Sequence, residues 1–186
     1  MQERELAILV KAVQAGDQEA FYQLFQQYKN EAYKTACLIT GNRSGAEDVV
    51  QEAFVQVFLK VKSLKQPEQF RSWFYKLLTR TAWRMGKRDK KLLPVEQIFE
   101  VMDEKGQYDQ QQAWAWLYDE IKQLEPKQKT VIVLYYFNGF TVKEIAVILG
   151  CLEGTVKSRL HTARKNLQAS LKDDHLGQEG RVIYER

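Results

Sequence analysis

The sequence predicts an all-α protein with two helical domains joined by a flexible linker, the C-terminal domain containing a helix-turn-helix. Apolar residues recur at helical spacing along most of the chain, and only three prolines and ten glycines occur among 186 residues. Periodicity fades between residues 91 and 107, where Pro94, Gly106 and several acids lie. The stretch from Thr141 to Leu167 then has the pattern of two helices around a tight turn.

Start and stop signals divide the N-terminal part into four helices. Asp17 suits an N-terminal cap, and Ser44 and Glu47 have the spacing of a capping box. Gly16 and Gly41 stand where helices should end. We therefore expect helices over about residues 3–15, 18–40, 45–61 and 68–85, with a loop at 63–67.

Similar signals organise the C-terminal part. Pro126 suits the first turn of a helix that ends at Asn138-Gly139. Thr141 and Glu144 have capping-box spacing, and Gly150 follows where a left-handed C-cap is needed. Helices are expected over about residues 108–123, 126–137, 141–149 and 152–172.

Charge separates these regions. Residues 71–91 contain eight cations and one acid, whereas residues 92–126 contain eight acids and two lysines. Residues 155–172 are again basic, with five cations and no acid. Two basic modules flanking an acidic connector favour nucleic acid as a partner of both modules. The boundaries we expect are an N-terminal domain at 1–90, an acidic linker at 91–107, a C-terminal domain at 108–172 and a polar tail at 173–186.

Several classes of function are disfavoured by what the sequence lacks. Cys37 and Cys151 form no metal-ligand pair, and two histidines are too few for a confident metal or acid–base site. Since no phosphate-binding loop or serine-nucleophile motif occurs, we expect a protein that is not an enzyme and has no cofactor and no metal. No apolar run is long enough to span a bilayer, and the N-terminus does not have the pattern of a signal peptide. We therefore expect a cytoplasmic protein.

The second helix of the helix-turn-helix has features suited to DNA. Val156, Leu160, Ala163 and Leu167 form its apolar side. Its solvent side holds polar and basic residues that could meet base edges and phosphates in a major groove. They are Lys157, Ser158, His161 and Lys165, flanked by Arg159 and Arg164. An ordinary helical hairpin with a solvated basic face is the alternative.

A second basic device lies on the helix expected near residues 68–85. One side is apolar, and the other is a continuous basic stripe of Lys76, Arg80, Arg84 and Lys87. Tyr75 and Trp83 flank this stripe. Aromatic side chains beside cations suit single-stranded DNA, because bases stack while phosphates are neutralised. The alternative is that Tyr75 covers the core, whereas Trp83 is difficult to place on the apolar side.

Three stretches, in order along the chain, together resemble one family. They are AEDVVQEAF at 46–54, FRSWFY at 70–75 and GTVKSR at 154–159. From about Leu6 to Leu171 the chain is similar to the extracytoplasmic-function sigma factors, the two-domain specificity subunits of bacterial RNA polymerase. The resemblance implies a protein that binds core polymerase, directs it to specific promoters and helps melt promoter DNA.

The resemblance also implies roles for particular residues. The residues implied for binding core polymerase are Asp48, Gln51, Glu52, Val55 and Phe58. Those implied for the −10 element and melting are Lys62, Lys65, Lys76, Arg80, Trp83, Arg84, Lys87 and Arg88. Those implied for the −35 element are Thr141, Thr155, Lys157, Ser158, Arg159, His161, Thr162, Arg164 and Lys165. The implied partners are core RNA polymerase, promoter DNA (duplex at −35 and single-stranded at −10) and an anti-sigma factor.

Two positions depart from the family pattern. Arg80 stands where many members have Asn, which affects the expected −10 preference. His161 and Thr162 stand where some members have an aromatic residue and an arginine, which affects the expected −35 preference. A stand-alone helix-turn-helix regulator is the alternative function, but residues 48–54 argue against it because a simple repressor does not need that surface.

Overall fold

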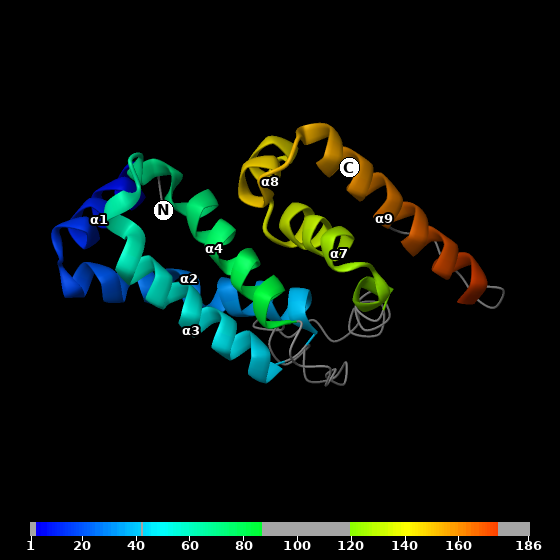
Figure 1. The fold of residues 1–186 in the computed structure, drawn as a ribbon, viewed down its shortest axis with the longest axis horizontal. Coiled ribbons are helices and arrows are strands. Elements are labelled where there is room, and N and C mark those ends of the chain that lie inside the picture. Colours follow the sequence, from blue (N-terminus) through cyan, green and yellow to red (C-terminus); the bar gives the residue numbers. More distant parts are fainter. Residues whose placement is uncertain (1–2, 42, 87–119, 175–186) are drawn as a thin grey trace.

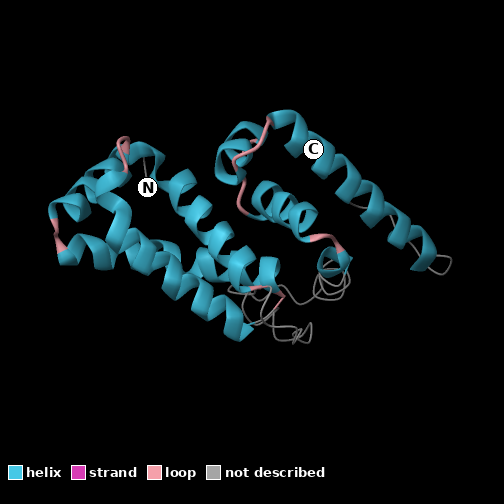
Figure 2. Cartoon of the chain, viewed as in Figure 1, coloured by secondary structure: helices cyan, strands magenta, loops and turns pink. Residues whose placement is uncertain are grey.

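A computed structural model describes the backbone of residues 3–41, 43–86 and 120–174 and the side chains of residues 4–41, 43–86 and 120–170. Within these ranges every regular element is helical (Figures 1 and 2). The first unit consists of α1 (Glu3–Ala15), α2 (Gln18–Thr40), α3 (Arg43–Lys60), the 3₁₀ turns η1 (Val61–Ser63) and η2 (Pro67–Gln69), and α4 (Phe70–Met85). The second consists of α7 (Pro126–Ile132), η4 (Val133–Phe137), α8 (Val142–Leu149) and α9 (Glu153–Asp174).

Local capping chemistry explains several helix ends. The Asp17 carboxylate accepts a hydrogen bond from the Ala20 amide, and the Thr141–Glu144 capping box is formed in both directions. Gly41 and Gly150 take the left-handed conformation at the C-caps of α2 and α8, with φ of 68° and 64°, where a side chain would be strained. The capping signals at these positions are confirmed.

Two local expectations need correction. The capping box at Ser44 and Glu47 is wrong, because α3 already begins at Arg43 and Ser44 lies inside the helix. The helix that starts at Pro126 does not continue regularly to Asn138; it widens into the π-helical segment η4. There the Asn138 amide donates to the Val133 carbonyl five residues back, at 3.1 Å. The expected linker, the tail after 174 and most of the helix at 108–123 lie outside the described residues.

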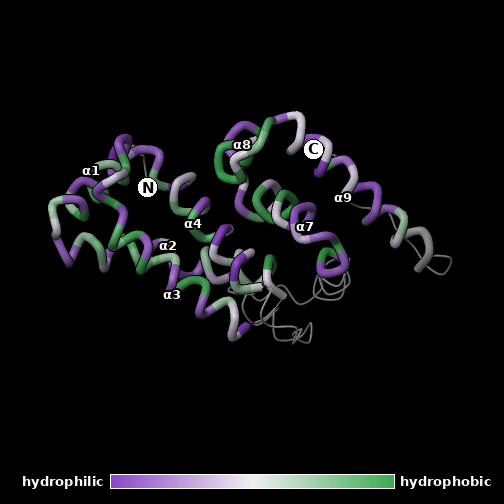
Figure 3. Tube along the Cα trace, in the orientation of Figure 1, coloured by the Kyte–Doolittle hydropathy of each residue, from purple (hydrophilic) through white to green (hydrophobic). Residues whose placement is uncertain are grey.

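The core of the first unit is aromatic. Phe74 lies against Phe54 and Phe70, with ring centroids 5.0 and 5.9 Å apart, and Tyr28 contacts both Phe70 and Phe74 edge to face. These contacts join α2, α3 and α4 around one buried centre. Hydrophobic and hydrophilic residues alternate along the helices (Figure 3), so one side of each packs inward and the other stays in solvent.

The second unit packs on the first. Helix α4 lies beside α8 (Figure 1), and η4 packs against α2. Phe140, between η4 and α8, is 1% exposed, and its ring contacts that of Tyr75 at 4.9 Å. Phe140, which follows η4 in the second unit, is therefore buried partly by the first unit.

Lys129 of α7 is a buried cation whose effect on stability can be measured. It is only 8% exposed, and burial together with the nearby charge of Lys122 lowers its pKa. Because folding disfavours the charged form, Lys129→Met should raise the free energy of unfolding at pH 7 by about 1 kcal/mol. The difference should shrink as the pH rises through the folded-state pKa, since the native side chain then loses its proton. Thermal or urea unfolding at pH 7 and near pH 10 measures both effects.

Lys127→Met is the matched control, because Lys127 is exposed on the same helix. It should change the free energy of unfolding by less than about 0.5 kcal/mol. Destabilisation by Lys129→Met beyond that of the control would show that the ammonium group is well accommodated where it lies.

Candidate functional site

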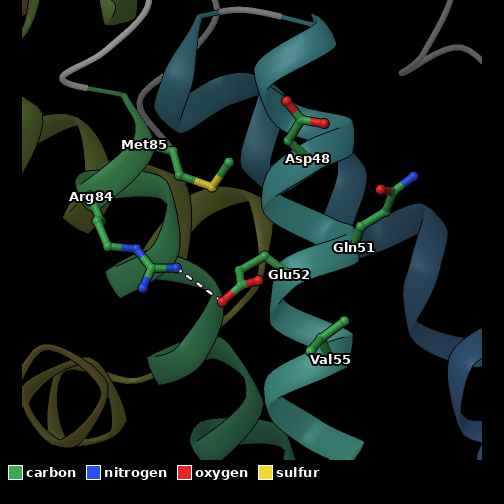
Figure 4. A pocket seen from close by; sticks show the side chains of 6 residues that line it. All are labelled: Asp48, Gln51, Glu52, Val55, Arg84 and Met85. Carbon is green, nitrogen blue, oxygen red and sulfur yellow. Dashed lines mark hydrogen bonds and ion pairs between the residues drawn. The ribbon is translucent and has the colours of Figure 1, made fainter.

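A groove lies between α3 and α4 (Figure 4). Asp48 and Gln51 are exposed at its edge, so they do not belong to the core. The residues that line it are Asp48, Gln51, Glu52 and Val55 from α3 and Arg84 and Met85 from α4. Four of the five residues expected to bind polymerase therefore share one surface. The groove also includes Met85, which was not among the residues expected to bind polymerase.

Glu52 and Arg84 form an ion pair across this groove. The Arg84 guanidinium donates to the Glu52 carboxylate at 3.1 Å, and the Gln56 amide donates to the same oxygen at 2.9 Å (Figure 4 shows the Arg84 bond). The Arg84 hydrogen bond is the main reason that the pKa of Glu52 is lowered. Such exposed pairs add little stability. The pair does connect a residue expected to bind polymerase with one expected to bind DNA.

The same surface of α3 continues as an apolar patch. Val55, Phe58 and Leu59 are 50%, 66% and 65% exposed. Phe58 lies edge to face against Phe21 of α2, with centroids 5.7 Å apart. Exposed side chains of this size next to a groove mark an interaction surface. Leu59 was missed from the sequence, although its position beside Phe58 was a usable signal.

The cations expected at the −10 element differ in how exposed they are. Arg80 and Arg84 are exposed, Lys76 is half-buried, and Lys62 and Lys65 are exposed near η1. Lys87 and Arg88 lie outside the described residues. The described part of the basic stripe is therefore accessible, but Arg84 at its end is shared with the α3–α4 groove.

The two aromatic residues beside the stripe differ in accessibility. Tyr75 is fully buried, and burial raises the pKa of its hydroxyl strongly, so stacking of a DNA base on Tyr75 is excluded in this form. The interpretation of Tyr75 as cover for the core is the better one. Trp83 is half-buried, and its indole N–H donates to the Thr130 hydroxyl of α7 at 2.9 Å. That contact was not expected from the sequence.

Helix α9 presents the residues expected to read duplex DNA. Its inner side packs through Val156, Leu160 and Ala163, which are buried. Six of the expected residues on this helix are exposed and make a surface that a major groove could receive. They are Lys157, Ser158, His161, Thr162, Arg164 and Lys165.

Four of the residues expected at the −35 element, the exposed Arg164 among them, are half-buried or make contacts within the second unit. Arg164 donates to the Tyr136 hydroxyl at 2.8 Å, and Arg159 contacts the Cys151 sulfur at 3.9 Å. The Thr141 hydroxyl belongs to the α8 capping box, and Thr155 is half-buried. Thr141 and Arg164 are exposed as well as hydrogen-bonded, whereas Arg159 and Thr155 are half-buried.

No group of three His, Cys, Asp or Glu side chains in the described part of the chain could hold a metal ion. Of the helices that the structure describes, none is both long and apolar enough to cross a membrane.

Family models match both helical units. The model described as Sigma-70 region 2 matches residues 24–91, and the model described as Sigma-70, region 4 matches residues 114–167. The first match contains the α3–α4 groove and the described basic stripe, and the second contains α8 and the exposed side of α9. The two kinds of surface therefore fall in two different sigma regions.

Whole-chain relatives and solved structures agree with these matches. The chain is 32% identical over 149 residues to the RNA polymerase sigma factor SigV of Bacillus subtilis, covering 80% of this chain and 89% of that protein. It is 31% identical over 180 residues to the ECF RNA polymerase sigma factor SigW of the same organism, covering 88% and 95%.

Two solved structures are similar in fold. CnrH, in complex with the cytosolic domain of CnrY, matches with a TM-score of 0.71 at 22% identity, covering 91% of this chain and 98% of CnrH. The sigma factor RpoE of Bartonella quintana, in complex with the anti-sigma factor NepR, matches with a TM-score of 0.57 at 25% identity, covering 92% and 97%. Sigma factors in general are not enzymes. The chain belongs to the extracytoplasmic-function sigma factors: it is an alternative sigma factor that works with RNA polymerase and promoter DNA in transcription initiation.

Proposed function

We propose that this sigma factor docks on core RNA polymerase through the α3–α4 groove and the adjoining patch of Val55 and Phe58. The observation that carries this assignment is the placement of Asp48, Gln51 and Glu52 along one exposed groove. Two carboxylates beside an apolar patch suit a partner helix that has both basic and apolar side chains. A stand-alone regulator would not need such a surface, which favours the sigma-factor role at these residues.

DNA recognition is divided between the two units in this proposal. Arg80, Lys76 and the loop lysines hold the melted −10 strand, and Trp83 stacks at the upstream edge of the bubble. The exposed side of α9 enters the major groove at the −35 element. Ser158 and His161 contact base edges there, whereas Lys157 and Lys165 contact phosphates.

The remaining assignments follow from this mechanism. The chain performs no chemical step, since RNA synthesis belongs to the polymerase, and it works in the cytoplasm with that enzyme. An anti-sigma factor is a further partner. Its support is that CnrH and Bartonella RpoE, which share the fold, were solved with the cytosolic domain of CnrY and with the anti-sigma factor NepR, respectively.

Docking is tested by the double substitution Asp48→Lys with Gln51→Ala. Both side chains are exposed, so helicity and the unfolding midpoint should stay unchanged while the affinity for core polymerase falls by at least roughly tenfold, as expected for charge reversal at an interface. Fluorescence anisotropy of the labelled sigma factor with core polymerase measures the change. Glu19→Lys with Gln23→Ala is a matched control, because it makes the same change on exposed positions of α2. Equal affinities for both variants would contradict the proposed docking groove.

Duplex recognition is tested by Lys157→Ala. Loss of one phosphate contact should reduce the slope of log affinity against log salt by about 0.9 for a −35 duplex. Lys127→Ala, at an exposed position of α7, should leave the slope unchanged. Filter binding or anisotropy of the holoenzyme over a salt series measures both. An unchanged slope for Lys157→Ala would mean that this part of α9 is only a solvated face.

Melting is tested by Trp83→Ala. Stacking of a base on an aromatic ring is worth about 1–3 kcal/mol, so open-complex formation on duplex promoter DNA should slow by about tenfold or more. A pre-melted template should restore most of the rate. Thr130→Val is the control, since it removes the acceptor of the Trp83 hydrogen bond but leaves the ring. Permanganate footprinting of thymines follows opening, and normal opening by Trp83→Ala would assign the melting role to other residues.

A further inference from the structure

Leu152, which directly precedes α9, is the most exposed large apolar side chain among the residues that the structure describes. It is 80% exposed, whereas Ile8, the next of these, is 68% exposed. Leu152 was not among the residues expected to bind DNA. Single apolar side chains on a surface are ordinary, so exposure alone assigns it no role. What distinguishes Leu152 is its position at the start of the helix that presents the −35 residues.

Leu152 occupies the N-cap of α9, where leucine is unfavourable. Its carbonyl oxygen accepts hydrogen bonds from the Thr155 amide at 2.9 Å and the Val156 amide at 3.2 Å, as an N-cap residue does. A leucine side chain cannot accept a bond from the free amides of the first turn, whereas Ser, Thr, Asp or Asn can. The N-cap of α8, Thr141, makes such a bond. Position 152 therefore lacks a stabilising cap and also leaves an apolar side chain in water, and local rules are broken in this way mostly at functional positions.

The turn before α9 fixes the position of this residue. The Cys151 amide donates to the Ala146 carbonyl at 3.0 Å, and Gly150 takes the left-handed conformation that ends α8. The Arg159 guanidinium contacts the Cys151 sulfur at 3.9 Å. Together with the two bonds from α9, these contacts hold the backbone of Leu152 from both sides. A contact made by its side chain is therefore pre-organised, and little entropy is lost when it forms.

The charges along α9 indicate what its first turn can face. This turn, from Glu153 to Val156, contains one acid and no cation. The exposed cations Lys157, Arg164 and Lys165 all lie further along. Phosphates repel a carboxylate, whereas a carboxylate accepts a hydrogen bond from a cytosine amino group, and an apolar side chain contacts a thymine methyl group. The start of α9 therefore suits base edges, and its cations suit the DNA backbone.

The geometry of a recognition helix agrees with this division. When such a helix enters a major groove, its N-terminal residues contact base edges. Leu152 lies six residues before Ser158, to which we assign a base contact, and this is about 9 Å along a helix. At about 3.4 Å per base pair, Leu152 reaches a base within roughly three base pairs of the one that Ser158 contacts. The apolar group that a base edge offers in the major groove is the 5-methyl group of thymine.

We propose that Leu152 is a specificity-determining residue of promoter recognition and reads a thymine of the −35 element through its 5-methyl group. The proposal rests on the proposed entry of α9 into the major groove at −35, and it names a base that this surface selects. Packing against the methyl group removes from water an apolar side chain that is exposed in the free protein. The unfavourable N-cap is thus explained by a contact that only DNA completes.

Removal of single methyl groups from the DNA tests this contact. A promoter selected from a fragment library by run-off transcription with the reconstituted holoenzyme supplies the −35 sequence. Each thymine of that element, on either strand, is then replaced by deoxyuridine. One replacement should weaken holoenzyme binding by about fourfold, the equivalent of one apolar group of methyl size. Leu152→Ala should bind the thymine and deoxyuridine duplexes equally, and competition followed by fluorescence anisotropy measures both ratios.

Three further variants separate a methyl contact from a structural effect. Leu152→Met keeps an apolar side chain and should keep the discrimination against deoxyuridine. Leu152→Ser should lose the discrimination but raise the unfolding midpoint by about 2–4 °C, because serine caps the helix. Val147→Ala is the matched control, since Val147 is an aliphatic side chain of α8 that is 56% exposed. It should keep the fourfold ratio, because the first helix of a helix-turn-helix crosses the DNA backbone and does not enter the groove.

Two results would overturn the proposal. One is a native chain that discriminates against deoxyuridine at no position of the −35 element. The other is a Leu152→Ala variant that keeps the native ratio at the sensitive thymine. The salt slope of Lys157→Ala separates this failure from failure of the proposed function. A reduced slope without methyl dependence leaves α9 in the major groove and removes only the role of Leu152, whereas an unchanged slope removes both.

Discussion

The packing of Phe74 against Phe54 is the contact on which the functional surfaces depend. It places α3 beside α4 with ring centroids 5.0 Å apart, and the groove between these helices exists only because they are held at this spacing. Phe70 and Tyr28 complete the cluster from α4 and α2. An aromatic core of this kind is stiff, so the side chains that project from its outer surface keep fixed relative positions.

Helix α4 has three different environments around it, and each has a different role. Its inner side is the core, one flank contributes Arg84 and Met85 to the groove, and another packs on the second unit, where Arg71 and Tyr75 contact Phe140. A change at one flank therefore reaches the others through a rigid helix. The Glu52–Arg84 ion pair is one such connection, because it joins α3 to the described end of the basic stripe on α4.

Local signals predicted most of the fold. The Thr141–Glu144 box, Asp17, Pro126 and the left-handed glycines act within one turn of chain, so the sequence was enough to place these ends. The exposed positions of Asp48 and Gln51 followed from helical periodicity in the same way. The predicted capping box at Ser44 and Glu47 was wrong, because residue spacing alone does not determine which residue begins a helix. The resemblance to the family, confirmed by the matches to both sigma regions, supplied the roles.

Long-range contacts could not be predicted in this way. Asn138 was interpreted as a turn residue, but its partners Tyr75 and Thr35 lie 63 and 103 positions away in the sequence. The hydrogen bonds from Trp83 to Thr130 and from Arg84 to Glu52 join residues 47 and 32 positions apart in the sequence. No periodic pattern in the sequence encodes such pairs. The burial of Tyr75 depends on the second unit as well as on its own helix. Such contacts depend on how helices pack, and only a structure reveals them.

Site-specific crosslinking in a reconstituted initiation complex tests the central claim most directly. A photoreactive amino acid replaces Gln51 on α3 in one preparation and Lys157 on α9 in another. The account predicts that position 51 crosslinks to a polymerase subunit and not to promoter DNA, and that position 157 crosslinks to duplex DNA around −35. Crosslinks from position 51 to DNA, or none from either position in an active complex, would contradict it.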